Sequence, residues 1–300
     1  MQKRLSGSLL VALAASFFGL AHVLGPMTYG AEGNNVFTLL LLNNLFALPV
    51  MAAAMKLCHI SFRCSRNAVL PLLVLGALGT AGTSLCLNAS FLFAGVGIGT
   101  MLHMSYLVVV ELADAVLLRQ RITAAVVVTL LMIGLGVFFL ASSDLGEGSS
   151  LPGIFLSLLS GCLYALYWLG ISHTAARQEH PIRVQFYASL IAAVVLLIYA
   201  VGTDQLAVAS MTRRAWVLNL GASFCSSVLG FLLTQIGIRQ IGAAEAAILG
   251  ALEPLTSVVL GAVLLGEALP ALKLLGCLCI LAGIFIKPIS QLLHRPAAKT

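Results

Sequence analysis

Long apolar runs separated by short polar breaks dominate the sequence. A helix needs about 20 mainly apolar residues to cross a hydrocarbon core of about 30 Å. The runs are continuous, unlike the short alternating segments of a membrane β-barrel. The pattern therefore predicts an all-α polytopic membrane protein with ten transmembrane helices, at residues 7–28, 36–57, 69–91, 96–118, 123–141, 152–173, 184–202, 216–238, 244–266 and 270–288.

Most breaks between these runs contain turn-forming residues. Glycine-rich polar segments follow the first run at residues 30–35 and the fifth run at residues 142–150. The third and fourth runs merge, and only Gly95, Gly97 and Gly99 mark the corner expected between them.

Composition excludes most other classes of protein. Of 300 residues, 60% are hydrophobic and 9% are charged, whereas a soluble domain has about 25% charged residues. High hydrophobicity also excludes a disordered chain. The seven cysteines lie mostly inside apolar runs, where they act as packing residues. Cys277 and Cys279 lack the further Cys or His ligands of a zinc site.

The charged residues predict the orientation in the membrane. Lys and Arg near span ends stay on the cytoplasmic side. With the amino terminus inside, 13 of the 16 basic residues fall in inside segments, and only Arg213, Arg214 and Lys273 fall outside. The net charge of +6 is therefore a topology signal and not a sign of nucleic-acid binding. We expect a multi-pass protein of the cell (inner or plasma) membrane with both termini cytoplasmic. Residues 1–25 resemble a signal peptide, but we favour an uncleaved first span, because cleavage would leave nine.

An internal repeat suggests the architecture. Residues 101–140 align with residues 248–287 without a gap and with ten identities, including the run 115–118 on 262–265. The same offset of 147 pairs Asn88 with Gln235. Five spans are an odd number, so the second half enters the membrane inverted. Inverted repeats around a midplane site are typical of secondary transporters. The expected units are residues 1–145 and residues 146–300, the second ending in a short basic cytoplasmic tail.

One stretch of the second half resembles a known family. Residues 246–254 (AAILGALEP), 264–267 (LLGE), 275–276 (LG) and 281–283 (LAG) resemble the second repeat of the EamA family, part of the drug/metabolite transporter (DMT) superfamily. The resemblance implies a ten-helix carrier with a central cavity between its halves, commonly exporting amino acids or related metabolites. The first half differs, with Tyr106-Leu107 and Arg119-Gln120 at the places of Glu-Pro and Gly-Glu. Two symmetric carboxylates are therefore not expected.

Glu253 is the sharpest candidate for a binding residue. It falls near the middle of the ninth span, where an ionisable group is costly and usually functional. Helical spacing places Thr256 and Ser257 on the same face, and Pro254 leaves a carbonyl without its helical donor, which kinks the helix. The face suits a substrate amine or a proton. The alternative is a protonated Glu253 hydrogen-bonded to a neighbouring helix.

Further candidates lie on other spans. His103 and Tyr106 share one arc of the fourth span with Asp114, near mid-depth, on the opposite wall of the same cavity. Each is a cavity residue or an ordinary packing residue. For Asp114 we favour an ion pair with Arg119 or Arg121, and Glu111 has no assigned role.

Amides and aromatic residues complete the set of candidates. Asn88 and Gln235 contact substrate or bridge helices, and we favour bridging. In the sixth span only Tyr164 is expected in the cavity, whereas Tyr167 and Trp168 fit an interfacial aromatic belt. Weaker candidates are Ser16, His22, Asn43 and Asn44, and Glu267 is expected to order a helix end.

Known catalytic motifs and ATP-binding motifs are missing from the sequence. We therefore predict a non-enzymatic secondary transporter without cofactor or metal, driven by a proton gradient or by exchange. It would export amino acids or related amine-containing compounds. The alternatives are cationic drugs, nucleosides or sugar-linked metabolites as substrates, or a membrane-embedded protein that does not transport. The partners expected are a small-molecule substrate, protons and the lipid bilayer; a monomer would suffice, and a homodimer is compatible with the sequence.

Overall fold

A computed structural model describes residues 2–119, 121–142, 150–266 and 269–293. Within these ranges the chain is helical apart from loops and one isolated bridge between Tyr29 and Asn34. Nine helical segments are long and apolar enough to cross a membrane, and a shorter apolar helix covers Ala271–Ile286. These segments overlap the ten predicted spans one by one, which confirms the expectation of an all-α polytopic membrane protein.

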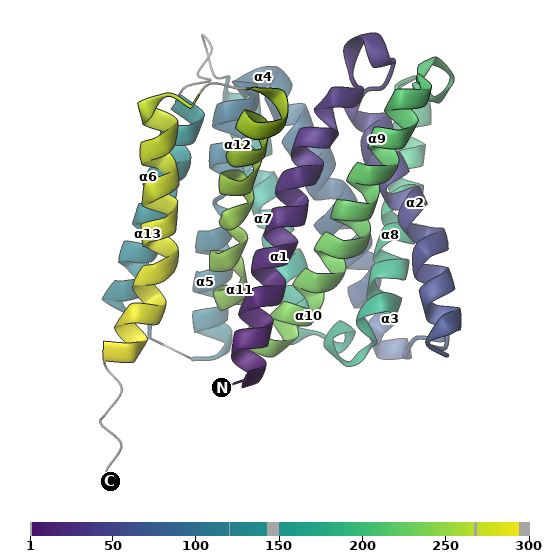
Figure 1. The fold of residues 1–300 in the computed structure, drawn as a ribbon. Coiled ribbons are helices and arrows are strands. Elements are labelled where there is room, and N and C mark those ends of the chain that lie inside the picture. Colours follow the sequence, from purple (N-terminus) through teal and green to yellow (C-terminus); the bar gives the residue numbers. More distant parts are fainter. Residues whose placement is uncertain (1, 120, 143–149, 267–268, 294–300) are drawn as a thin grey trace.

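The helices stand side by side as a bundle (Figure 1). Their bounds are α1 Gln2–Leu24, α2 Val36–Leu57, α3 Arg66–Val74, α4 Thr83–His103, α5 Tyr106–Leu117, α6 Ala124–Ser142, α7 Leu151–His173, α8 Pro181–Gly202, α9 Arg213–Ser223, α10 Phe231–Ile241, α11 Ala243–Gly250, α12 Leu252–Leu265 and α13 Ala271–Leu293. Two π-helical segments, η3 (Leu75–Gly82) and η6 (Phe224–Gly230), join α3 to α4 and α9 to α10. We call the side where α1 begins the amino-terminal face and the other side the opposite face.

The internal repeat in the sequence has a counterpart in the helices. Helices α3 and α9 begin at Arg66 and Arg213, and helices α6 and α13 begin at Ala124 and Ala271, in both cases 147 residues apart. The two π-helical segments also overlap when shifted by 147. A π-helical turn adds a residue to the helix and is frequent at functional sites. The division of the chain near residue 145 stays a prediction.

Two spans are interrupted at matching positions. Helix α4 ends next to Met104, with φ −62° and ψ −6°, and α11 ends next to Ala251, with φ −62° and ψ −7°. Pro254 explains the second interruption, because its ring nitrogen carries no hydrogen for the carbonyl of Gly250. The corresponding residue in the first half is Leu107, so the same backbone shape forms there without a proline. Helix ends at mid-span leave backbone polar groups free near the centre of the bundle.

Small residues set the closest helix contacts. Helices α6 and α13 lie side by side at one end of the bundle (Figure 1). A Cβ built on Gly136 would lie 2.7 Å from the carbonyl oxygen of Gly276, so these two backbones touch. The main buried cluster extends from this contact into the bundle and includes Tyr106 of α5, Tyr167 and Trp168 of α7, and Ile248 of α11. Residues beside both interruptions thus belong to this cluster.

Candidate functional site

A narrow cavity lies beside the interruption of the second repeat. The lining side chains leave about 190 Å³ of non-atom space between them, but no part of it is wide enough for a water molecule. Helices α1, α7, α10, α11 and α12 supply its lining, which consists of Val11, Ala15, Phe18, Tyr164, Trp168, Thr234, Gly250 and Glu253. Glu253 is the one charged residue in this lining. A single carboxylate among aromatic and small side chains is suited to an amine or a proton.

Glu253 is positioned by the close approach of α1 to α12. It lies in the first turn of α12, with Oε1 3.3 Å from Nδ1 of His22. The carboxylate side chain is 16% exposed and the imidazole side chain 61% exposed. Gly19 permits the approach, because a Cβ on this residue would lie 3.0 Å from the carbonyl oxygen of Glu253. Glu253 is thus largely buried, yet it contacts a group that reaches the surface of the helix bundle.

Aromatic rings form the wall opposite Glu253. Tyr106 packs edge-on against Tyr164, with centroids 4.9 Å apart, and stacks on Trp168 at 5.9 Å. The rings of Tyr164 and Trp168 are T-shaped at 5.8 Å. Such a wall is able to attract a cation through the ring faces. The Trp168 Nε1 group is buried, and the Tyr164 hydroxyl lies close enough to interact with it.

His103 supports this wall from behind. Its Nδ1 lies 2.9 Å from the Ser160 hydroxyl, and that hydroxyl donates to the carbonyl oxygen of Ser157 at 2.6 Å. Because the serine proton is already used, Nδ1 of His103 is the donor in this contact. The imidazole ring also packs against Tyr106 and Tyr164, with centroids 5.7 Å and 5.3 Å away. His103 therefore fixes both tyrosine rings and is absent from the cavity lining.

Comparison with known proteins shows which family this site belongs to. Residues 151–287, which include Trp168, the interrupted helix and Glu253, match the EamA-like transporter family. The match lies within the carboxyl-terminal half of the chain. The resemblance predicted from the sequence is confirmed.

Relatives of this protein are named as transporters. An uncharacterized transporter of Archaeoglobus fulgidus is 27% identical over 62% of this chain and 64% of its own length. The uncharacterized transporter YcbK of Bacillus subtilis is 28% identical over 48% of this chain and 46% of its own. The threonine/homoserine exporter RhtA of Escherichia coli is 28% identical over 64% and 68%. The chain thus spans less than two thirds of the length of the first two relatives.

The fold of this protein also occurs in a solved crystal structure. The two chains superpose with a TM-score of 0.82 at 16% identity, and the match covers 97% of this chain and 99% of the other. At this identity the likeness concerns the fold alone.

Two aromatic residues of the chain lie elsewhere than the sequence suggested. The expectation of an interfacial belt for Tyr167 and Trp168 is wrong, since they are 0% and 2% exposed. Both residues face the bundle interior, because α7 is a central helix packed against α4, α5 and α10. Trp168 lines the cavity, whereas the Tyr167 hydroxyl accepts a hydrogen bond from Gln235 Nε2 at 3.0 Å. A residue's depth along a span does not reveal which side of its helix is buried.

The two predicted amides have different partners. Gln235 bridges helices, since its Nε2 also donates to Oε1 of Gln185 on α8 at 2.8 Å. Asn88 donates to the carbonyl of Ser84 in its own helix at 2.8 Å. Neither lines the cavity.

Thr256 and Ser257 pack between helices. The Thr256 hydroxyl donates to the carbonyl of Leu252 at 2.9 Å, and the Ser257 hydroxyl donates to the carbonyl of Glu253 at 3.1 Å. A Cβ on Gly19 would lie 2.7 Å from Cβ of Thr256. These two side chains thus line the contact with α1, while Glu253 alone of the three lines the cavity.

Asp114 has other partners than Arg119 or Arg121, with which an ion pair was predicted. Its Oδ1 lies 2.5 Å from Nε2 of His173 on α7, and its Oδ2 accepts a hydrogen bond from the backbone N–H of Ala244 at 3.4 Å. The predicted ion pair is wrong because α7 and α11 pack against α5. These helices are far apart in the sequence, so their contact was not evident from it. Glu111 is buried in α5, and Glu267 lies outside the described residues.

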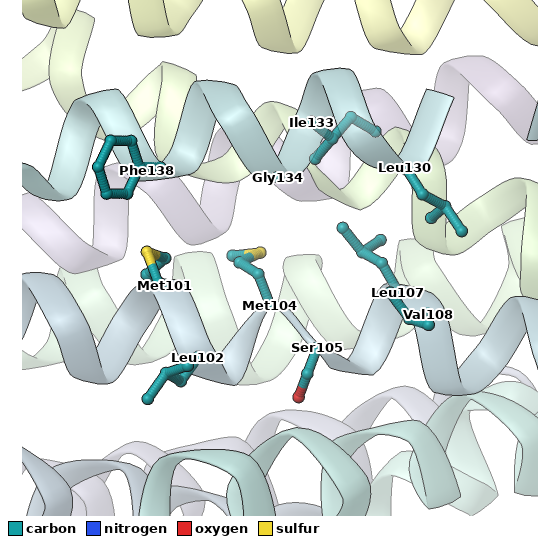
Figure 2. Close-up of a pocket in the computed structure, with 10 residues that line it drawn as sticks. All are labelled: Met101, Leu102, Met104, Ser105, Leu107, Val108, Leu130, Ile133, Gly134 and Phe138. Atoms are coloured by element: carbon teal, nitrogen blue, oxygen red, sulfur yellow. The ribbon is translucent and has the colours of Figure 1, made fainter. Parts of the chain in front are cut away.

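A larger hollow lies between α4–α5 and α6, with about 660 Å³ of empty space (Figure 2). Its lining is apolar apart from Ser105, and Figure 2 shows Met101, Met104 and Leu107 projecting toward α6. With no ionisable group in its lining, the hollow is a poorer substrate site than the Glu253 cavity. Within the described residues, no group of three or more His, Cys, Asp or Glu side chains could hold a metal.

Proposed function

We propose that this protein is a secondary active transporter that exports small amine-containing metabolites, with amino acids as the leading class. It works by alternating access, driven by a proton gradient or by exchange. The observation that carries the proposal is Glu253. This carboxylate lies in the first turn after an interruption of a membrane span and lines a cavity that five helices enclose. Interrupted spans around a midplane site are characteristic of secondary transporters.

The chemistry of the cavity supports an amine as the recognised group. A charged hydrogen bond in a water-poor site is about twice as strong as a neutral one, and Glu253 offers two acceptor oxygens for it. Tyr164 and Trp168 add ring faces for a cation. The name of the E. coli relative, a threonine/homoserine exporter, agrees with this class of substrate.

Proton coupling is proposed at the same residue. A carboxylate that binds either a proton or an amine forces the two to alternate, which converts a proton gradient into substrate flux. His22 extends from Glu253 to an exposed position and provides a route for protons. We further propose that the protein lies in the cell membrane with its amino-terminal face in the cytoplasm, because the basic residues gather on that side.

The test uses purified protein in liposomes loaded with an amino-acid mixture, with a pH gradient imposed and efflux read by mass spectrometry. Wild-type protein should release a few amines faster than empty liposomes. Glu253→Gln keeps the size of the side chain and removes its charge, so efflux should fall about tenfold or more, as expected for a buried charged hydrogen bond.

A matched control separates loss of function from loss of structure. Glu245 belongs to α11, eight residues before Glu253, and pairs with Arg4 at 2.5 Å outside the cavity. Glu245→Gln should therefore retain efflux. Unchanged gradient-dependent efflux in Glu253→Gln would remove Glu253 from the mechanism, and equal loss in both variants would show a general structural effect.

A further inference from the structure

Two glutamates occupy matching places on opposite faces of the molecule. Glu32 follows α1, Glu179 follows α7, and the two are 147 residues apart. Each contacts the residue that precedes a helix of the other half: Ser65 before α3 and Thr212 before α9. Ser65 and Thr212 are also 147 residues apart. Matching residues thus meet twice, once on each face, with the halves exchanged, although the bonding atoms differ.

At the amino-terminal face, Glu179 holds the start of α3. Its Oε1 accepts a hydrogen bond from the Ser65 backbone N–H at 2.8 Å, and its Oε2 pairs with Arg183. Burial opposes ionisation of this carboxyl, but the Ser65 and Arg183 contacts outweigh it, so the pKa of Glu179 lies below its ordinary value. We call this contact the inner latch.

At the opposite face, Glu32 holds the start of α9. Its carboxylate accepts a hydrogen bond from the Thr212 hydroxyl, and its carbonyl oxygen accepts one from the Thr212 backbone N–H at 3.0 Å. Arg214 adds an ion pair at 3.3 Å. We call this contact the outer latch.

Each latch joins two elements that lead to the Glu253 cavity. The outer latch ties the end of α1 to α9, which continues through η6 into α10; α1 and α10 both line the cavity. The inner latch ties the end of α7, another lining helix, to α3, which continues through η3 into α4 and its interruption at Met104. Both latches join the two halves, so opening a path on either face requires the latch there to separate.

We propose that Glu179 and Glu32 are the gate residues of the transport cycle: release of the inner latch opens the cavity to the amino-terminal face, and release of the outer latch opens it to the opposite face. This inference rests on the proposed transport function. Alternating access requires that the faces open in turn, and two copies of one contact, inverted between the faces, supply such a pair of gates.

The latches differ in burial, which sets the size of the expected effects. The side chains of Glu179 and Arg183 are 6% and 16% exposed, whereas those of Glu32 and Arg214 are 20% and 65% exposed. Solvent screening weakens exposed ion pairs. Removal of the inner latch should therefore shift the balance between the faces more than removal of the outer latch.

The test measures access to the cavity without any substrate. Thr234 lines the cavity and is replaced by cysteine in a chain whose seven native cysteines are changed to serine or alanine. A membrane-impermeant thiol reagent is added to right-side-out and inside-out vesicles, and an epitope at the amino terminus identifies each face. The labelling rate reports which face is open.

Glu179→Ala should raise the labelling rate from the amino-terminal face about tenfold, the effect of losing a buried hydrogen bond to a charged group, and lower it from the opposite face. Glu32→Ala should do the reverse with a smaller change. Asp204→Asn is the control, because this acid lies exposed near the opposite face outside either latch; its labelling should match the parent chain.

A second pair of variants breaks the same contacts from the other side. Ser65 has φ −66°, which proline adopts without strain, so Ser65→Pro removes the N–H donor to Glu179. Thr212→Val removes the hydroxyl donor to Glu32. Each should reproduce the effect of its partner's alanine variant. Labelling rates that match the parent chain from both faces in all four variants would overturn the proposal and leave the latches as structural contacts. If the wild-type protein shows no amine efflux but its labelling rate differs between the two faces, only the substrate and the coupling proposed above are overturned.

Discussion

Gly19 offers a test of how the cavity is assembled. A Cβ on this residue would meet Cβ of Thr256 at 2.7 Å, the carbonyl oxygen of Glu253 at 3.0 Å and the backbone nitrogen of Ser257 at 3.0 Å. Ordinary carbon contacts lie at about 3.5–4.0 Å, and two of these three atoms belong to the backbone. Gly19→Ala would therefore push α1 away from α12 by about 1 Å.

That displacement has a calculable effect on the site. The His22–Glu253 distance is 3.3 Å, and an added separation of about 1 Å takes it beyond hydrogen-bond range. Overpacking costs about 1–3 kcal/mol, while alanine in a helix gains about 1 kcal/mol over glycine. We expect a lower Tm in detergent and a loss of gradient-driven efflux.

Gly221→Ala in α9 is the matched control. A Cβ there would lie 3.6 Å from Cδ1 of Leu24, an ordinary contact. This variant should keep efflux and gain slightly in Tm through helix propensity. If Gly19→Ala has the Tm and efflux of Gly221→Ala, the tight contact between α1 and α12 is not needed, and the reasoning about Glu253 and His22 fails.

Two further predictions concern groups at the amino-terminal face. Asp114→Asn should lower the Tm by weakening the contacts with His173 and Ala244, at a cost of about 1.5–3 kcal/mol for hydrogen bonds to a charged group. Arg121→Gln should leave the Tm unchanged. A lower Tm in Arg121→Gln with an unchanged Tm in Asp114→Asn would support the ion pair expected from the sequence instead. Because the pKa of Glu179 is lowered from 4.5, its stabilising contribution is complete above that value and is lost as pH falls through the folded-state pKa. The Tm of the wild type should therefore decrease as the pH drops below about 5. Glu179→Gln should lack this part of the decrease, and identical Tm–pH curves for both proteins would contradict the assignment.

The two halves of the chain are similar in backbone but not in chemistry. Both interrupted spans have the same angles beside the break, yet Tyr106 lies where the second repeat has Glu253. The first half supplies Phe18 to the cavity lining, and the second half supplies Tyr164, Trp168 and the carboxylate. One site with a single ionisable group therefore lies between pseudo-equivalent elements, which explains why a symmetric pair of carboxylates is not needed.

The hydropathy pattern is enough to predict where the membrane helices lie along the chain. Twenty apolar residues cannot remain in water, and their backbone groups must bond within the segment, so each run becomes a spanning helix whatever its neighbours are. The ungapped offset of 147 also predicted where helices would start again, and Pro254 predicted a break near mid-span. Glu253 was found for the same reason, because a lone carboxylate in an apolar run is costly wherever the helix packs.

Which side chains contact one another depends on how the helices pack in the tertiary structure. An apolar helix is apolar all round, so its sequence does not reveal which side faces lipid and which faces the bundle. Trp168 was therefore assigned to an interfacial belt although it lines the cavity, and Asp114 to nearby arginines although it bonds His173. The contact of Glu179 with Ser65 joins residues that lie 114 positions apart. Such contacts depend on how the two halves pack against each other, and residue spacing along one helix carries no information about that packing.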